Sequence, residues 1–189
     1  MTTIQREQSA ARRADASTTE ASVRESASAA VVRYGAVALR LSLGWVFLWA
    51  FLDKAFGLGH DTAGKDSWLN GGSPTKGFLG FATAGPFKGV YHQIAGQGSA
   101  DVLFMLGLVA IGGALMLGIA MRFAAGAGAV LLVLMWTAVL PPANNPFMDD
   151  HLIYAVLLVV LAAIGAGHTF GLGARWEALP LVRRYTWLR

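Results

Sequence analysis

Four long apolar runs constrain the fold of this chain more than any other feature of its sequence. They cover residues 31–52, 102–121, 123–140 and 152–170, and only the first is interrupted by arginine, at Arg33 and Arg40. Each is close to the roughly 20 residues with which a helix crosses a hydrocarbon core about 30 Å thick. With 55% hydrophobic and 14% charged residues, a chain of 189 residues is too apolar for an ordinary soluble domain. The sequence therefore predicts an integral membrane protein that contacts the lipid bilayer.

We expect an all-α fold, namely an antiparallel four-helix transmembrane bundle with a long outer loop that carries short amphipathic helices. The predicted transmembrane domain covers residues 31–176, and its spans lie near residues 32–56, 102–118, 121–140 and 150–168. Residues 1–30 are polar and lack apolar periodicity, which is typical of a disordered tail. Residues 177–189 form a second, basic tail.

Arginine and lysine fall in different parts of the chain, and this distribution predicts its orientation. All eleven arginines lie in the first tail, in the first half of span one, at the turn between spans two and three, or after span four, whereas the four lysines lie elsewhere. The positive-inside rule then places both termini of this multi-pass protein in the cytoplasm. The net charge of +4 follows this topology, so we expect no nucleic-acid partner.

The loop between spans one and two contains eleven glycines and two positions that favour a helix start, after Ser73-Pro74 and after Pro86. Small residues recur along spans two and three, which predicts that these two helices pack closely. They are Ala110, Ala114, Gly118, Ala125, Gly126, Gly128 and Ala129.

The start of span four carries the residues best suited to chemistry. Asp149, Asp150 and His151 stand where a helix would enter hydrocarbon, and ionisable groups there usually have a partner or a task. A helix cap accounts for one aspartate but not for two and a histidine. Asp150 and Tyr154 are four residues apart and can share one helical face. We therefore take Asp149, Asp150, His151 and Tyr154 as candidate catalytic residues.

Span one carries a second set of polar residues, with two interpretations left open. In the first, Arg40 snorkels or pairs inside the bundle while Trp49, Asp53 and Lys54 mark the outer interface. In the second, Arg40 lines an internal cavity together with Lys54. With Lys88 from the outer loop, these are the candidate residues for binding a substrate or a quinone: Arg40, Trp49, Asp53, Lys54 and Lys88.

The chain contains no cysteine, which excludes disulfides, thiolate metal ligands and a redox-active thiol of its own. The four histidines show no paired spacing on one membrane helix that would hold a haem, and no haem, flavin or metal motif is evident. Redox chemistry would therefore need a bound cofactor or a partner.

Several short motifs together resemble the DoxX family of four-helix bacterial and archaeal membrane proteins. They are Arg40, Gly44 and Asp53-Lys54, then Leu117-Gly118 with Arg122, then Asn145-Pro146 with Asp149-Asp150-His151, and finally Gly171-Leu172-Gly173. The resemblance covers about residues 32–184, and the long insert is similar to the DoxD-like subunit of thiosulfate:quinone oxidoreductase. It implies membrane-bound sulfur or quinone redox chemistry, or an anchor for redox partners.

Two hypotheses from different classes follow. As a quinone-linked oxidoreductase subunit, the chain would use His151 with Asp149 or Asp150 and Tyr154 to supply protons to a quinone. Lys54 and Lys88 would attract an anionic sulfur compound such as thiosulfate. The alternative is a non-catalytic scaffold that anchors a second oxidoreductase subunit or forms a homo-oligomer. A transporter is a third hypothesis, although four short spans would need to oligomerise to enclose a pathway.

Overall fold

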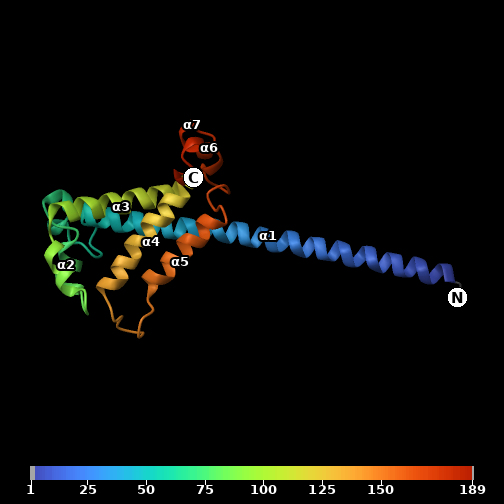
Figure 1. Ribbon diagram of the computed structural model, residues 1–189, viewed down its shortest axis with the longest axis horizontal. Helices are drawn as coiled ribbons and strands as arrows, with labels where there is room; N and C mark the ends of the chain where they lie inside the picture. Colours follow the sequence, from blue (N-terminus) through green and yellow to red (C-terminus); the bar gives the residue numbers. More distant parts are fainter. Residues whose placement is uncertain (1–2, 189) are drawn as a thin grey trace. The chain divides into compact units, whose positions relative to one another are not determined.

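The computed structural model describes residues 3–188, and it describes side chains from residue 25 onward. Every regular element in this part of the chain is helical (Figure 1). The longer helices are α1 (Thr3–Phe56), α3 (Gly98–Leu117), α4 (Met121–Ala138) and α5 (Asp150–Ala163). The short ones are η1 (Gly64–Asp66), η2 (Trp68–Asn70), the π-helical turn η3 (Phe78–Ala82), α2 (Lys88–Ile94), α6 (Gly173–Glu177), α7 (Pro180–Arg184) and η4 (Thr186–Leu188).

Among the residues that the structure describes, three helical segments are long and apolar enough to cross a membrane. They are Glu25–Phe56 within α1, α3 and α4. The fourth predicted span, residues 150–168, forms the shorter helix α5, whose 14 residues extend about 21 Å. Helix α5 ends early because Gly165 adopts a positive φ of 67° and the amide of Ala166 donates to the carbonyl of Leu161, an ending typical of glycine.

The first tail differs from our expectation of disorder, because residues 3–30 are part of helix α1. No glycine or proline precedes Gly35, and alanine, arginine, glutamate and glutamine are all good helix formers. An apolar stripe is needed to pack a helix but not to form one, so its absence was a poor guide. The chain forms two compact units, Met1–Ala36 and Val37–Arg189, and the second contains the cavity, the Asp149–His151 pair and Arg40 described below.

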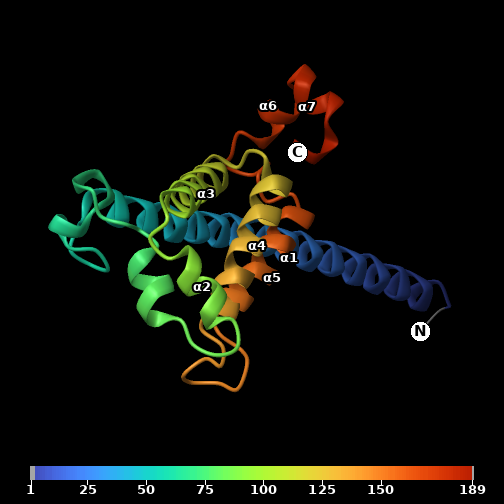
Figure 2. The ribbon, with the colours of Figure 1, turned by 60° about the vertical axis from the view of Figure 1, so that its left-hand side comes forward.

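Within the second unit, glycines let the helices approach closely. A Cβ atom on Gly112 of α3 would lie 2.8 Å from the backbone nitrogen of Leu48 in α1. A Cβ atom on Gly128 of α4 would lie 2.6 Å from Leu158 of α5, 3.3 Å from Ile111 of α3 and 3.7 Å from Phe47 of α1. Four helices thus converge on Gly128, and α4 and α5 lie side by side in both ribbon views (Figures 1 and 2).

The loop between α1 and α3 is tied to the first turn of α3 by the buried carboxylate of Asp101. One of its oxygens accepts hydrogen bonds from the Ser73 hydroxyl at 2.9 Å, the Thr75 amide at 3.0 Å and the Thr75 hydroxyl at 2.6 Å. The Thr75 hydroxyl in turn accepts from the amide of Gly96 at 3.1 Å. These bonds hold the part of the loop that contains η3 and α2 beside the N-terminal end of α3 and the C-terminal end of α4.

We expect Gly112→Val to lower the free energy of unfolding by about 1–3 kcal/mol, because the new side chain would push into the backbone of α1. Gly113→Val is the matched control, since a Cβ atom on Gly113 would meet nothing within 4 Å. Both variants change helix propensity equally, so thermal unfolding in detergent isolates the effect of packing. Equal unfolding temperatures for the two variants would contradict the close α1–α3 contact.

Candidate functional site

An apolar cavity of about 520 Å³ lies between α3 and α4 and is bounded at one end by the loop. Along α4 its lining runs from Phe123 to Met135, a distance of about 18 Å at 1.5 Å per residue. The lining residues are Pro74, Thr75, Phe78, Leu79, Tyr91, Ile94, Ala100, Leu103, Phe104, Gly107, Ile111, Phe123, Gly126, Ala127, Val130, Leu131, Leu134 and Met135.

The side-chain hydroxyls of the lining belong to Thr75 and Tyr91, and both are engaged by the protein. The Tyr91 hydroxyl donates to the carbonyl of Leu134 at 2.8 Å and is also hydrogen-bonded to Thr137. The Thr75 hydroxyl donates to Asp101. The cavity therefore suits an apolar molecule with few polar groups, because such sites are mostly hydrophobic with a few fixed polar groups.

Small residues create this cavity, which the sequence did not predict. Gly107 and Gly126 line it, and a Cβ atom on Gly126 would meet nothing within 4 Å. Gly128, two residues further along α4, instead packs against Leu158. The signal in the sequence was the run of glycine and alanine in spans two and three, but it does not tell which of these residues close a contact and which leave a space.

At the start of α5, Asp149 and His151 form a pair. Asp149 caps the helix, because one of its oxygens accepts from the amide of Leu152 at 3.2 Å. Its other oxygen lies 2.8 Å from Nδ1 of His151, and the more distant Asp150 is 3.5 Å from the same nitrogen. His151 is 20% exposed and Asp150 67% exposed. No hydrogen bond joins the Tyr154 hydroxyl to Asp150 in the part of the chain whose side chains are described.

This pair is suited to proton transfer with the solvent, since a histidine oriented by a carboxylate is a common proton donor and acceptor. The ligand atoms of Asp149, Asp150 and His151 lie within 4.8 Å of one another, a spacing that a divalent cation would fit. Asp149 already serves the cap and the histidine, however, so the structure accounts for these contacts without a metal.

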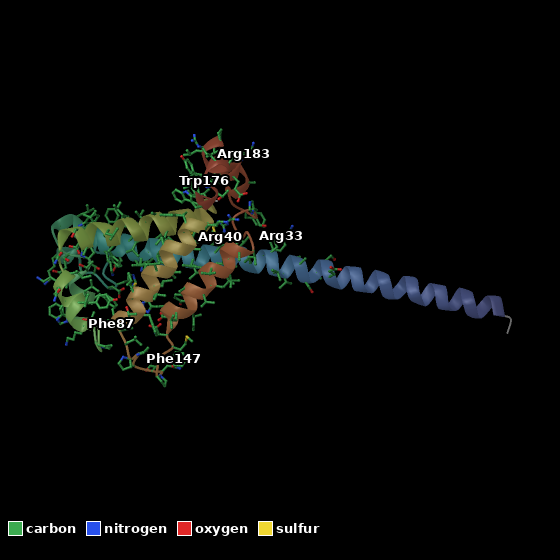
Figure 3. The ribbon with its side chains drawn as sticks, viewed as in Figure 1. Arg33, Arg40, Phe87, Phe147, Trp176 and Arg183 are labelled. Carbon is green, nitrogen blue, oxygen red and sulfur yellow. The ribbon has the colours of Figure 1, made fainter. Side chains whose placement is uncertain are left out.

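Arg40 is fully buried and binds backbone carbonyls at the end of α3 and after α5 (Figure 3). Its NH1 nitrogen donates to the carbonyl of Leu115 at 2.6 Å and of Met116 at 3.2 Å. Its NH2 nitrogen donates to Phe170 at 2.9 Å and to Thr169 at 3.5 Å. The guanidinium therefore holds two segments of the chain together, consistent with the interpretation that Arg40 pairs inside the bundle.

Asp53 is buried too, and it holds the start of the loop. One oxygen accepts from the amide of His60 at 3.2 Å and the other from the amide of Asp61 at 3.0 Å. The ring of Trp49 meets the ring of His60 edge to face at 5.0 Å. Lys54 is half-buried, Lys88 is exposed, and neither has a carboxylate within ion-pair distance among residues 25–188.

None of the nine residues predicted to form a site lines the 520 Å³ cavity. The structure brings Asp149, Asp150 and His151 together, and it links Trp49 to Asp53 through His60. It does not bring Arg40 into the cavity. The catalytic and binding roles of these residues stay predictions.

Comparisons with protein-family models, with curated proteins and with solved structures found no match. The fold and the cavity define a class, a helical membrane protein with an apolar space between two of its spanning helices. The function proposed below rests on the residues of this chain and on the resemblance that its motifs show.

We expect Arg40→Met to lower stability by about 1.5–3 kcal/mol or more, because hydrogen bonds from a charged group are lost and buried carbonyls stay unpaired. Arg33→Met, two turns earlier in α1, is the control, since Arg33 is exposed and its guanidinium donates to the hydroxyl of the neighbouring Tyr34 at 3.0 Å. Thermal unfolding in detergent compares them. If Arg40→Met unfolded at the same temperature as the Arg33 variant, the anchoring role would be wrong.

Proposed function

We propose that the chain is a DoxX-like protein of the plasma membrane that binds a quinone in the cavity between α3 and α4 and serves sulfur-compound or quinone redox chemistry. The observation that carries this proposal is the cavity itself, whose 520 Å³ falls in the range of about 300–1,000 Å³ typical of small-molecule sites. Its apolar lining and its length along α4 suit the ring and tail of a ligand that enters from the lipid.

The proposed fold is the antiparallel four-helix bundle with both termini in the cytoplasm. Helix α5 is short for a span, but the segment after it continues to the end of α3, where the amide of Leu172 donates to the carbonyl of Leu117 at 2.8 Å. This contact supports a fourth crossing made of α5 together with that segment. The short helices of the loop would then lie on the outer membrane surface.

Three of the motifs behind the DoxX resemblance support it further because they meet in space. Arg40 binds next to Gly118, and a Cβ atom on Gly118 would lie 2.6 Å from its NH1 nitrogen. A Cβ atom on Gly171 would lie 3.3 Å from the Cα atom of Gly118, and one on Gly173 would lie 3.0 Å from the carbonyl oxygen of Gly118. Three motifs that are far apart in the sequence thus form one tightly packed cluster, as motifs of one shared fold should.

The redox role divides between the ligand and the chain. A bound quinone supplies a two-electron acceptor that also takes up two protons. Pro74 and Phe104 are among the residues that would hold it, and the Asp149–His151 pair would exchange protons at the membrane rim. Lys54 and Lys88 would attract an anionic sulfur compound such as thiosulfate. A sulfur compound could not be carried as a persulfide of this chain, which has no cysteine.

The second candidate is a non-catalytic scaffold that anchors a redox partner, either a second oxidoreductase subunit or another copy of the chain. One observation favours it. Arg40 and Asp53 are two of the predicted binding residues, and both form hydrogen bonds with backbone groups of their own chain. The two candidates differ in whether the purified chain binds a quinone at all.

We expect Val130→Trp to weaken quinone binding about tenfold or more, because forcing bulk into a filled site costs about 1–3 kcal/mol. Val133→Trp is the control on the same helix, since Val133 is exposed but does not line the cavity. Equilibrium dialysis of the detergent-purified chain against a short-tailed quinone measures the affinity. A chain that binds no quinone, or equal affinity in both variants, would overturn the proposed site.

The rim pair is tested separately. In membranes of a deletion strain complemented with His151→Ala, we expect thiosulfate-dependent reduction of a soluble quinone analogue to fall well below that of the intact gene. His92→Ala, an exposed histidine of α2, serves as the control at matched protein level. Unchanged activity with His151→Ala would remove the pair from proton transfer, and equal activity without the gene would favour the scaffold.

A further inference from the structure

The C-terminal segment folds back onto the start of α4 instead of trailing away from it. Helices α6, α7 and η4 pack together, with Val182 only 1% exposed and the indole nitrogen of Trp176 donating to the carbonyl of Leu188 at 2.6 Å. Two contacts attach this cluster to α4. Arg122 donates to the carbonyl of Thr186 at 3.3 Å, and the ring of Trp187 lies 6.2 Å from that of Phe123.

Positive charge gathers on this cluster without a compensating acid. Arg122, Arg175, Arg183 and Arg184 are all exposed, and Arg183 is seen with Trp176 in the C-terminal segment in Figure 3. Among residues 25–188 no carboxylate lies within ion-pair distance of any of the four arginines. The acidic residue of the segment, Glu177, instead pairs with His168 at 3.2 Å.

Large apolar side chains are exposed beside these arginines. Leu181 is 61% and Trp187 58% exposed, and Leu179 and Tyr185 are exposed as well. Trp187 contacts Phe123 in the first turn of α4, so these side chains lie at one end of a helix that is long enough to cross the membrane. Aromatic rings and arginines with apolar neighbours are typical of the membrane–water interface.

We propose that the arginine cluster, defined as Arg122, Arg175, Arg183 and Arg184, binds the phosphate groups of anionic phospholipids in the leaflet next to the α3–α4 turn. The exposed side chains of Leu181 and Trp187 enter the acyl region of the same leaflet. Charge complementarity and the position at the end of a membrane-crossing helix favour a lipid over a soluble acidic partner, because Trp187 lies where that helix would meet the bilayer surface. This inference stands independently of quinone binding.

The test compares two lipids that differ only in headgroup charge. The full chain, purified in detergent, is incubated with equal amounts of phosphatidylglycerol and phosphatidylcholine that carry the same acyl chains. The lipid retained after gel filtration is then quantified by mass spectrometry. We expect the chain to retain phosphatidylglycerol preferentially. Arg183→Gln/Arg184→Gln should reduce that preference about fivefold or more, because even one basic side chain near an anionic membrane surface changes the affinity about fivefold.

Lys65→Gln/Lys76→Gln is the matched control, because it removes the same charge from two exposed loop positions. Circular dichroism and the unfolding temperature verify that each variant is folded. A second arm keeps the wild-type chain and raises salt from about 0.1 M to about 1 M, which shortens the Debye length from about 10 Å to about 3 Å and should weaken the preference. A wild-type chain without preference, or equal preference in both double variants, would overturn the proposal.

Discussion

A buried guanidinium holds one end of the helical unit together. Removing the charge of Arg40 from water is costly, and among residues 25–188 no carboxylate lies within ion-pair distance to offset that cost. The compensation comes from the carbonyls at the C-terminal end of α3, where the helix dipole is negative, and from the carbonyl of Phe170. The planar fork of arginine reaches both segments at once, which the single ammonium of lysine would not. Arg40 therefore joins the end of α3 to the chain after α5, in addition to the hydrogen bond between the Leu172 amide and the Leu117 carbonyl.

In the same unit, the positions of glycine residues decide where two helices come into close contact and where a cavity remains between them. Membrane helices gain little from burying apolar surface, so close van der Waals packing has to hold them together. Gly112 and Gly128 supply that packing by allowing α1, α3, α4 and α5 to meet. Gly107 and Gly126 face no such partner and help to form the apolar cavity. The same residue type thus allows close helix contact at one position and leaves an apolar space at another.

The ionisable groups discussed above lie apart from the apolar cavity. The cavity is lined by apolar side chains, whereas the Asp149–His151 pair and the arginine cluster lie outside its lining. A ligand drawn from the lipid would meet apolar walls, and protons or phosphate groups would be handled at the rims. Such a division is what a protein that works between the bilayer and the aqueous phases requires, because ionised groups are expensive inside hydrocarbon.

The sequence by itself predicted the membrane class and, among its four expected spans, the three that form helices long and apolar enough to cross a membrane, since hydropathy acts locally. It grouped Asp149, Asp150 and His151 but left open which aspartate pairs with the histidine. It did not determine that Arg40 binds carbonyls 75 and 130 residues away, that Asp53 holds the loop amides, or that the cavity draws on the loop, α3 and α4. Nor did it predict the early end of α5 or the helical start of α1. The physical reason is that composition specifies a helix but not its rotation about its own axis. Only tertiary packing decides which glycine meets a neighbour and which leaves a space.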